Sequence, residues 1–132
     1  YADDGVERIV ATAASAESGP AKALRDAGVT VVSLPGPDGR VDLARLHTWL
    51  GQRYPMPVST LMVEGGGILA AALLRAGLIH KAHLFMAPSF IGADGLPSLG
   101  DLGVVYPDRA PRLNITDVHH HGPDLEIVGY PT

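Results

Sequence analysis

The chain contains several short apolar runs. Residues 8–13, 29–34, 58–63 and 83–87 are rich in apolar side chains, and each run has the length of a strand. Continuous apolar runs of this length are typical of strands that are buried on both faces of a parallel sheet. We therefore predict four buried strands in this part of the chain.

Segments with helical periodicity lie between these runs. Residues 21–27 are followed by Gly28, and residues 68–76 are followed by Gly77. A glycine just past the last periodic residue is a common helix end. Asp42 is placed to cap a third helix. The apolar face of that helix carries Leu43, Leu46, Trp49 and Leu50. Helices that alternate with strands in this way predict an α/β fold, a mostly parallel sheet flanked by helices.

The last third of the chain has a different composition and hydrophobic pattern. Residues 88–111 are rich in glycine, proline and aspartate, which predicts one long ordered loop. Residues 112–119 and 124–130 then form two further strand-like segments, with His120-His121-Gly122-Pro123 between them. This arrangement predicts a C-terminal antiparallel hairpin. No repeat or low-complexity tract marks a boundary, so we expect residues 1–132 to form a single domain.

Composition narrows the possible functions. The 132 residues are 46% hydrophobic, enough for one core, and the net charge of −4 argues against a nucleic-acid partner. The absence of cysteine removes disulfides, thiolate catalysis and cysteine-based zinc sites, and it fits a cytoplasmic location. No apolar run approaches the roughly 18 residues of a membrane span, so we expect no membrane partner.

The segment from Val63 to Ala72 carries the strongest chemical signal. A lone carboxylate, Glu64, precedes three consecutive glycines, and an alanine- and leucine-rich helix follows them. The first N–H groups of a helix have no partners within it, and the helix dipole adds partial positive charge there, so phosphates often bind at such a turn. A tight turn in which glycine only permits close packing explains the same spacing. Three successive glycines exceed the needs of a turn, which favours a group bound close to the backbone.

A wider set of residues accompanies this turn. The set comprises Glu64-Gly65-Gly66, Leu69, Leu73-Leu74, Ala76-Gly77-Leu78, Phe85-Met86-Ala87-Pro88, Ile91-Gly92 and Asp94-Gly95. Together these residues resemble the reductase domain of the bifunctional riboflavin-biosynthesis deaminase/reductase. The resemblance implies a dihydrofolate-reductase-like fold, a homodimer, and NADPH-dependent reduction of 5-amino-6-(5-phosphoribosylamino)uracil to its ribitylamino form. Motifs that the family carries upstream, such as a Ser-Leu-Asp-Gly-like strand, are not found here, so we expect a C-terminal portion of that domain.

The resemblance also implies roles for residues at and around Gly65-Gly66-Gly67, called the glycine turn below. Glu64 corresponds to a glutamate that contacts the substrate, and no residue is assigned to catalysis. The implied NADPH-binding residues are Gly66, Gly67, Ile68, Leu69, Ala70, Ala71 and Ala72. The fold commonly has a cis peptide bond at this turn, which we expect between Gly65 and Gly66. Candidates to hold the 2′-phosphate of NADPH are Ser15, Ser18 and Lys22.

Several alternatives stay open. Glu64 can be a carboxylate favoured only by the helix dipole. His119-His120-His121 suggests a metal site, but consecutive strand residues point to alternate faces, so we expect no metal. The chain can be part of a reductase, a non-catalytic nucleotide-binding or assembly module, or a related reductase of another substrate. A transferase or hydrolase is disfavoured, because the sequence has no P-loop or Gly-x-Ser-x-Gly motif. If upstream segments supply the rest of the site, the 132-residue chain binds nucleotide without turnover.

Overall fold

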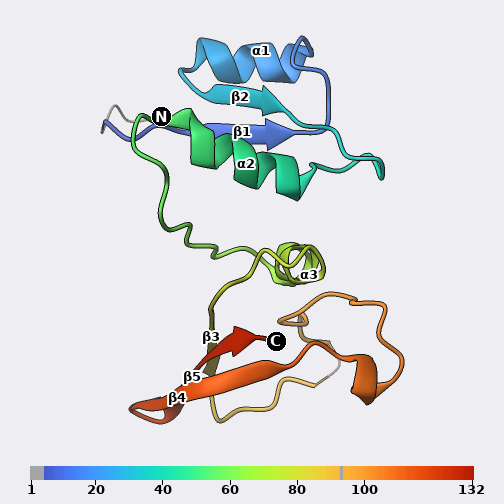
Figure 1. Cartoon of the computed structure of the whole chain (residues 1–132), viewed down its shortest axis with the longest axis vertical. Helices are drawn as coiled ribbons and strands as arrows, with labels where there is room; N and C mark the ends of the chain where they lie inside the picture. Colours follow the sequence, from blue (N-terminus) through green and yellow to red (C-terminus); the bar gives the residue numbers. More distant parts are fainter. Residues whose placement is uncertain (1–4, 93) are drawn as a thin grey trace. The chain divides into compact units, whose positions relative to one another are not determined.

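A computed structural model describes residues 5–92 and 94–132 of the chain. The chain divides into two compact units, one that ends at Leu61 and one that begins at Met62 (Figure 1). The single domain expected from the sequence stays a prediction. No helix in the described residues is long and apolar enough to cross a membrane.

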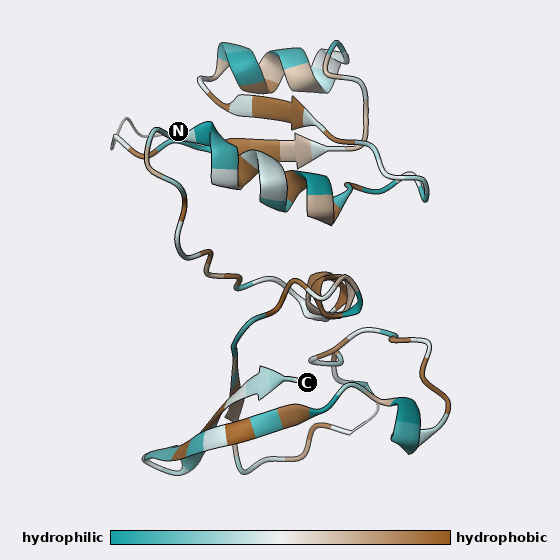
Figure 2. Cartoon of the chain, in the orientation of Figure 1, coloured by the Kyte–Doolittle hydropathy of each residue, from teal (hydrophilic) through white to brown (hydrophobic). Residues whose placement is uncertain are grey.

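The first unit has the order β1 (Ile9–Thr12), α1 (Gly19–Asp26), β2 (Thr30–Ser33) and α2 (Leu43–Arg53). β1 and β2 are parallel, and their register pairs the first residue of β1 with the first residue of β2. Hydrophobic residues concentrate in these two strands (Figure 2). The buried apolar residues of the unit are Ala21, Val29 and Leu34. The first two strands and the first two helices predicted from the sequence are thus confirmed, although the residues of both strands are half-buried and not buried as predicted.

Local signals in the sequence set the ends of these helices. The Ser18 hydroxyl accepts a hydrogen bond from the Ala21 N–H at the start of α1, and the Asp42 carboxylate accepts one from the Arg45 N–H at 2.9 Å at the start of α2. Gly28 follows α1 with a φ of 80°, a left-handed conformation that suits glycine. The predicted cap at Asp42 and the predicted helix end at Gly28 are therefore confirmed.

The second unit contains α3 (Gly67–Arg75), β3 (Ala82–Met86), the 3₁₀ turn η1 (Pro107–Arg109), β4 (Leu113–His121) and β5 (Asp124–Pro131). The strand order is β3-β5-β4, and both pairings are antiparallel. The strand predicted over residues 83–87 is therefore present as β3, but the prediction that it is buried is wrong, because four of its five residues are exposed. The predicted C-terminal hairpin is confirmed. Its connection is shorter than expected, because β4 extends through the histidines and only two residues form the turn.

The segment from Val58 to Val63 is not the buried strand predicted from its apolar run. No residue of this segment pairs with a strand in the described part of the chain. The side chains are exposed instead, with 54% of Leu61 and 80% of Met62 accessible to solvent. A strand requires a neighbour to share its backbone hydrogen bonds, and an apolar run alone does not supply one.

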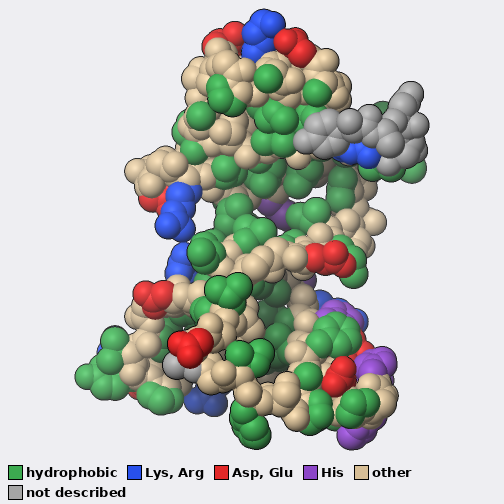
Figure 3. Space-filling model, turned by 180° about the vertical axis from the view of Figure 1, so that it is seen from behind, with side chains coloured by type: hydrophobic (Ala, Val, Ile, Leu, Met, Phe, Trp, Pro, Cys, Tyr) green, Lys and Arg blue, Asp and Glu red, His purple; other side chains and the backbone are tan. Residues whose placement is uncertain are grey.

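The second unit exposes much of its apolar surface. Among the described residues, Ala71 and Val128 are its buried apolar residues, whereas Phe85 is 70% exposed and Phe90 fully exposed. Hydrophobic side chains accordingly occupy a large share of the visible surface (Figure 3). Few large side chains are therefore withdrawn from water in this unit, and the homodimer expected from the sequence stays a prediction.

Candidate functional site

The glycine turn lies at the N-terminus of α3. Gly66 is the N-cap residue, with φ −69° and ψ 171°. The N–H groups of Leu69 and Ala70 both donate to the Gly66 carbonyl oxygen, at 3.0 and 3.1 Å. In contrast, the N–H groups of Gly66, Gly67 and Ile68 donate to no other group in the described residues. Three backbone donors are thus available at the positive end of the helix dipole.

The three glycines of the turn differ in what a side chain at each would meet. A Cβ at Gly65 would lie 2.6 Å from Cδ2 of Leu69, and a Cβ at Gly67 would lie 2.6 Å from the carbonyl oxygen of Pro97. A Cβ at Gly66 would meet nothing within 4 Å. Close packing within the chain therefore explains Gly65 and Gly67 but not Gly66. The space beside Gly66 is open next to the three free N–H groups.

The other residues expected to bind the cofactor have less direct parts in this turn. The Leu69 and Ala70 N–H groups already have an acceptor, as described above. Ala71 is buried with 1% of its surface exposed, and Ala72 is half-buried in α3. These four residues therefore shape the first turns of the helix, and the free donors belong to Gly66, Gly67 and Ile68.

The peptide bond between Gly65 and Gly66 is trans. The described residues contain no cis peptide bond, so the cis bond expected from the resemblance is wrong for this structure. A cis bond that does not precede proline costs about 3–4 kcal/mol and needs surroundings that enforce it.

Glu64 lies in the extended segment that leads into the turn. Its side chain is exposed, and its carboxylate has no hydrogen-bond or ion-pair partner among the described residues. The carboxylate is thus available to a ligand. Its role as a substrate contact stays a prediction, as does the interpretation that only the helix dipole favours it.

The three candidates for a 2′-phosphate contact each have a local partner. The Ser15 hydroxyl accepts from the Glu17 N–H at 3.2 Å, and the Ser18 hydroxyl caps α1. The Lys22 ammonium pairs with Asp26 at 2.9 Å, with both side chains largely exposed. Exposed pairs of this spacing contribute only about 0.3–0.5 kcal/mol, so Lys22 can readily leave its partner. The phosphate contact stays a prediction.

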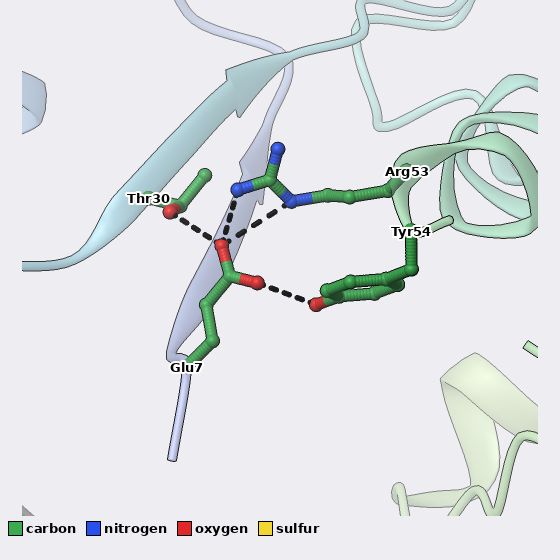
Figure 4. A network of polar contacts seen from close by, with 4 residues as sticks. All are labelled: Glu7, Thr30, Arg53 and Tyr54. Carbon is green, nitrogen blue, oxygen red and sulfur yellow. Dashed lines mark hydrogen bonds and ion pairs between the residues drawn. The ribbon is translucent and has the colours of Figure 1, made fainter. Parts of the chain in front are cut away.

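A polar network in the first unit was not predicted from the sequence (Figure 4). The Glu7 carboxylate accepts hydrogen bonds from the hydroxyls of Thr30 at 2.8 Å and Tyr54 at 2.5 Å, and it also forms an ion pair with Arg53. Hydrogen bonds from Arg53, Tyr54 and Thr30 lower the pKa of Glu7 from 4.5 to about 2. The same carboxylate raises the pKa of the Tyr54 phenol. The network ties the segment before β1 to β2 and to the end of α2.

A second unpredicted cluster crosses the antiparallel sheet. The Glu126 carboxylate on β5 contacts His83 Nδ1 of β3 at 2.7 Å and His121 Nε2 of β4 at 2.9 Å. Hydrogen bonds from His83 and His121 lower the pKa of Glu126. No group of three or more metal-ligating side chains is suitably placed for a metal ion in the described residues. We assign this cluster to the pairing of the three strands.

Comparisons with known proteins relate the chain to riboflavin biosynthesis. The family model of the RibD C-terminal domain matches residues 2–127. The riboflavin biosynthesis protein RibD of Escherichia coli (strain K12) is 33% identical over 108 residues, which cover 76% of this chain and 27% of that protein. The chloroplastic riboflavin biosynthesis protein PYRR of Arabidopsis thaliana is 34% identical over 130 residues, which cover 95% of this chain and 20% of that protein. The chain thus spans less than a third of the length of these relatives.

Solved structures share the fold. One is Acinetobacter baumannii RibD (form 2), with a TM-score of 0.75 and 22% identity over 94% of this chain and 31% of that chain. Another is the riboflavin biosynthesis reductase Rib7 of Saccharomyces cerevisiae, with a TM-score of 0.64 and 17% identity over 94% of this chain and 55% of that chain. The α/β, dihydrofolate-reductase-like fold expected from the sequence is confirmed.

Proposed function

We propose a function for this chain from its family, since the chain belongs to the RibD C-terminal domain family. The chain carries part of the site of an NADPH-dependent reductase of riboflavin biosynthesis. The substrate is 5-amino-6-(5-phosphoribosylamino)uracil, and the product is its ribitylamino form. One observation in the structure carries the proposal: three free N–H groups surround an open glycine at the start of α3. The homodimer and the cytoplasmic location belong to the same proposal.

The first turn of α3 fits a phosphate group of NADPH. The N–H groups of Gly66, Gly67 and Ile68 donate to no other group in the described residues, and the helix dipole favours an anion beside them. The missing side chain at Gly66 leaves space for an approach to the backbone. NADPH supplies a hydride when bound, and the protein supplies its orientation. Leu69, Ala70, Ala71 and Ala72 support the turn from within the helix.

Glu64 orients the substrate in this proposal. An unpaired carboxylate accepts hydrogen bonds from sugar hydroxyls or from the N–H of a pyrimidine base. Such contacts hold the acceptor carbon in a defined position, and correct positioning can account for much of the rate of a two-reactant step. Glu64 therefore acts as a substrate-binding residue, and no proton transfer is assigned to it.

An activity assay of the protein in its longest natural form tests this function. We expect consumption of NADPH only with the phosphoribosylamino-pyrimidine, and a product heavier by two hydrogens in mass spectrometry. Glu64→Gln should raise the KM for the substrate. Asp108→Asn is the control, because the Asp108 carboxylate is also exposed and has no side-chain partner among the described residues.

Three results would contradict the proposal. Glu64→Gln kinetics that equal those of Asp108→Asn would remove Glu64 from the substrate site. Nucleotide binding with no product from any pyrimidine would favour the non-catalytic module over the reductase. Reduction of a different substrate would favour a related reductase instead.

A further inference from the structure

A segment of the long loop lies directly against the first residue of α3. The Gly100 N–H donates to the Gly67 carbonyl oxygen at 2.9 Å. A Cβ at Gly67 would lie 2.6 Å from the Pro97 carbonyl oxygen, and a Cβ at Gly100 would lie 3.2 Å from the Gly67 carbonyl oxygen. The two backbones thus touch with no side chain between them. Each of these two glycines makes that close approach possible.

The same segment is also held at the last residue of α3. The Arg75 guanidinium donates to the carbonyl oxygen of Asp101. The Asp101 carboxylate in turn accepts from the Gly103 N–H at 2.7 Å, which fixes the local turn. Residues 97–103, called the strap below, therefore have one attachment at each end of the helix.

We propose that Gly67 and Arg75 are positioning residues that hold the strap on α3, and that the seated strap sets the shape of the glycine turn. Gly67 connects the two features, since its carbonyl oxygen accepts from the strap while its N–H is one of the three free donors of the turn. A shift of the strap therefore moves the glycine turn, because closely packed backbones leave little room for adjustment. The effect on nucleotide binding rests on the proposed function, whereas the attachment of the strap does not.

Hydrogen exchange of the free chain tests the attachment, resolved by residue with NMR. In the wild type, the Gly100 N–H should be protected. Gly67→Ala should remove this protection, because the new Cβ would lie closer to the Pro97 oxygen than the 3.0 Å that real Cβ atoms respect. Gly66→Ala is the matched control, since a Cβ there meets nothing within 4 Å. Arg75→Met should release the Asp101 end and expose the Gly103 N–H, and Arg75→Lys should restore its protection.

Titration with NADPH then tests the link to the turn. Gly67→Ala should weaken binding about tenfold, as expected for misplacing a hydrogen bond to a charged group. Arg75→Met should weaken binding by a smaller factor, and Arg75→Lys should recover it. If Gly67→Ala does not fold, the Arg75 pair decides the outcome.

The possible failures are distinguishable. Fast exchange of the Gly100 N–H in the wild type would contradict the attachment of the strap to α3. Equal protection of the Gly103 N–H in Arg75→Met and Arg75→Lys would contradict it too. If a variant releases the strap but binds NADPH with unchanged affinity, the strap does not set the shape of the glycine turn. If the wild type does not bind NADPH, the proposed function fails and the effect on binding fails with it. The exchange pattern of the free chain then still supports or overturns the attachment.

Discussion

Val128 of β5 tests the burial in the antiparallel sheet, since only 4% of its surface is exposed. Val128→Ala removes two carbon atoms from this buried position. At about 0.8 kcal/mol for each buried carbon, the transfer term is about 1.6 kcal/mol. Incomplete collapse of the cavity raises the loss to about 2 kcal/mol. Val118 of β4 is the matched control because 54% of its surface is exposed. Val118→Ala should therefore cost about 0.7 kcal/mol.

Urea denaturation followed by far-ultraviolet circular dichroism measures both losses. The lower strand propensity of alanine affects both variants, so the difference between them reports burial. We expect Val128→Ala to unfold with the lower free energy by about 1.3 kcal/mol, which is roughly a ninefold change in the unfolding constant. Equal losses would contradict the difference in burial between Val128 and Val118, because they would mean that the Val118 side chain is also covered in solution.

Two further predictions concern the free energy of unfolding. Because its hydrogen bonds lower the pKa of Glu7 from 4.5 to about 2, the ionised carboxylate stabilises the fold above pH 4.5, and this contribution is lost as the pH falls toward 2. Glu7→Gln should therefore reduce stability at neutral pH and flatten the acid dependence in urea titrations, and an unchanged acid dependence would contradict the network. Gly77→Ala should cost about 1 kcal/mol, because Gly77 has a φ of 65°. Gly66→Ala should leave the thermal midpoint unchanged, since its φ is −69°, and similar losses in the two variants would be inconsistent with these conformations.

Local signals predicted most of the secondary structure. The cap at Asp42 and the glycines that follow α1 and α3 act within one or two turns of a helix, so the sequence alone reveals them. The pairing of strands is a different matter. The apolar run from Val58 to Val63 has the composition of a buried strand, yet in this structure it has no neighbour and stays exposed. Hydrophobic pattern shows what a segment can bury and does not show which partner it meets.

The candidate site could be predicted only in part. The glycine turn was located by its place between an apolar run and a helix, and the structure adds which of the three glycines faces open space. Contacts between distant residues had no signal in the sequence. Glu7 and Arg53 are 46 positions apart, and the contact between Gly67 and Gly100 depends on how the long loop folds back. Such contacts follow from tertiary structure and not from local composition.

Titration calorimetry with NADPH tests the phosphate site at the glycine turn, using the wild type, Gly66→Val and Gly51→Val. Gly51 is the control because a Cβ there, as at Gly66, meets nothing within 4 Å, and it lies in α2 of the first unit. The wild type and Gly51→Val should bind NADPH alike. Gly66→Val should bind at least roughly tenfold more weakly, because its side chain blocks hydrogen bonds to a charged phosphate. Equal affinity of all three proteins, or no binding by the wild type, would contradict a phosphate site at the glycine turn.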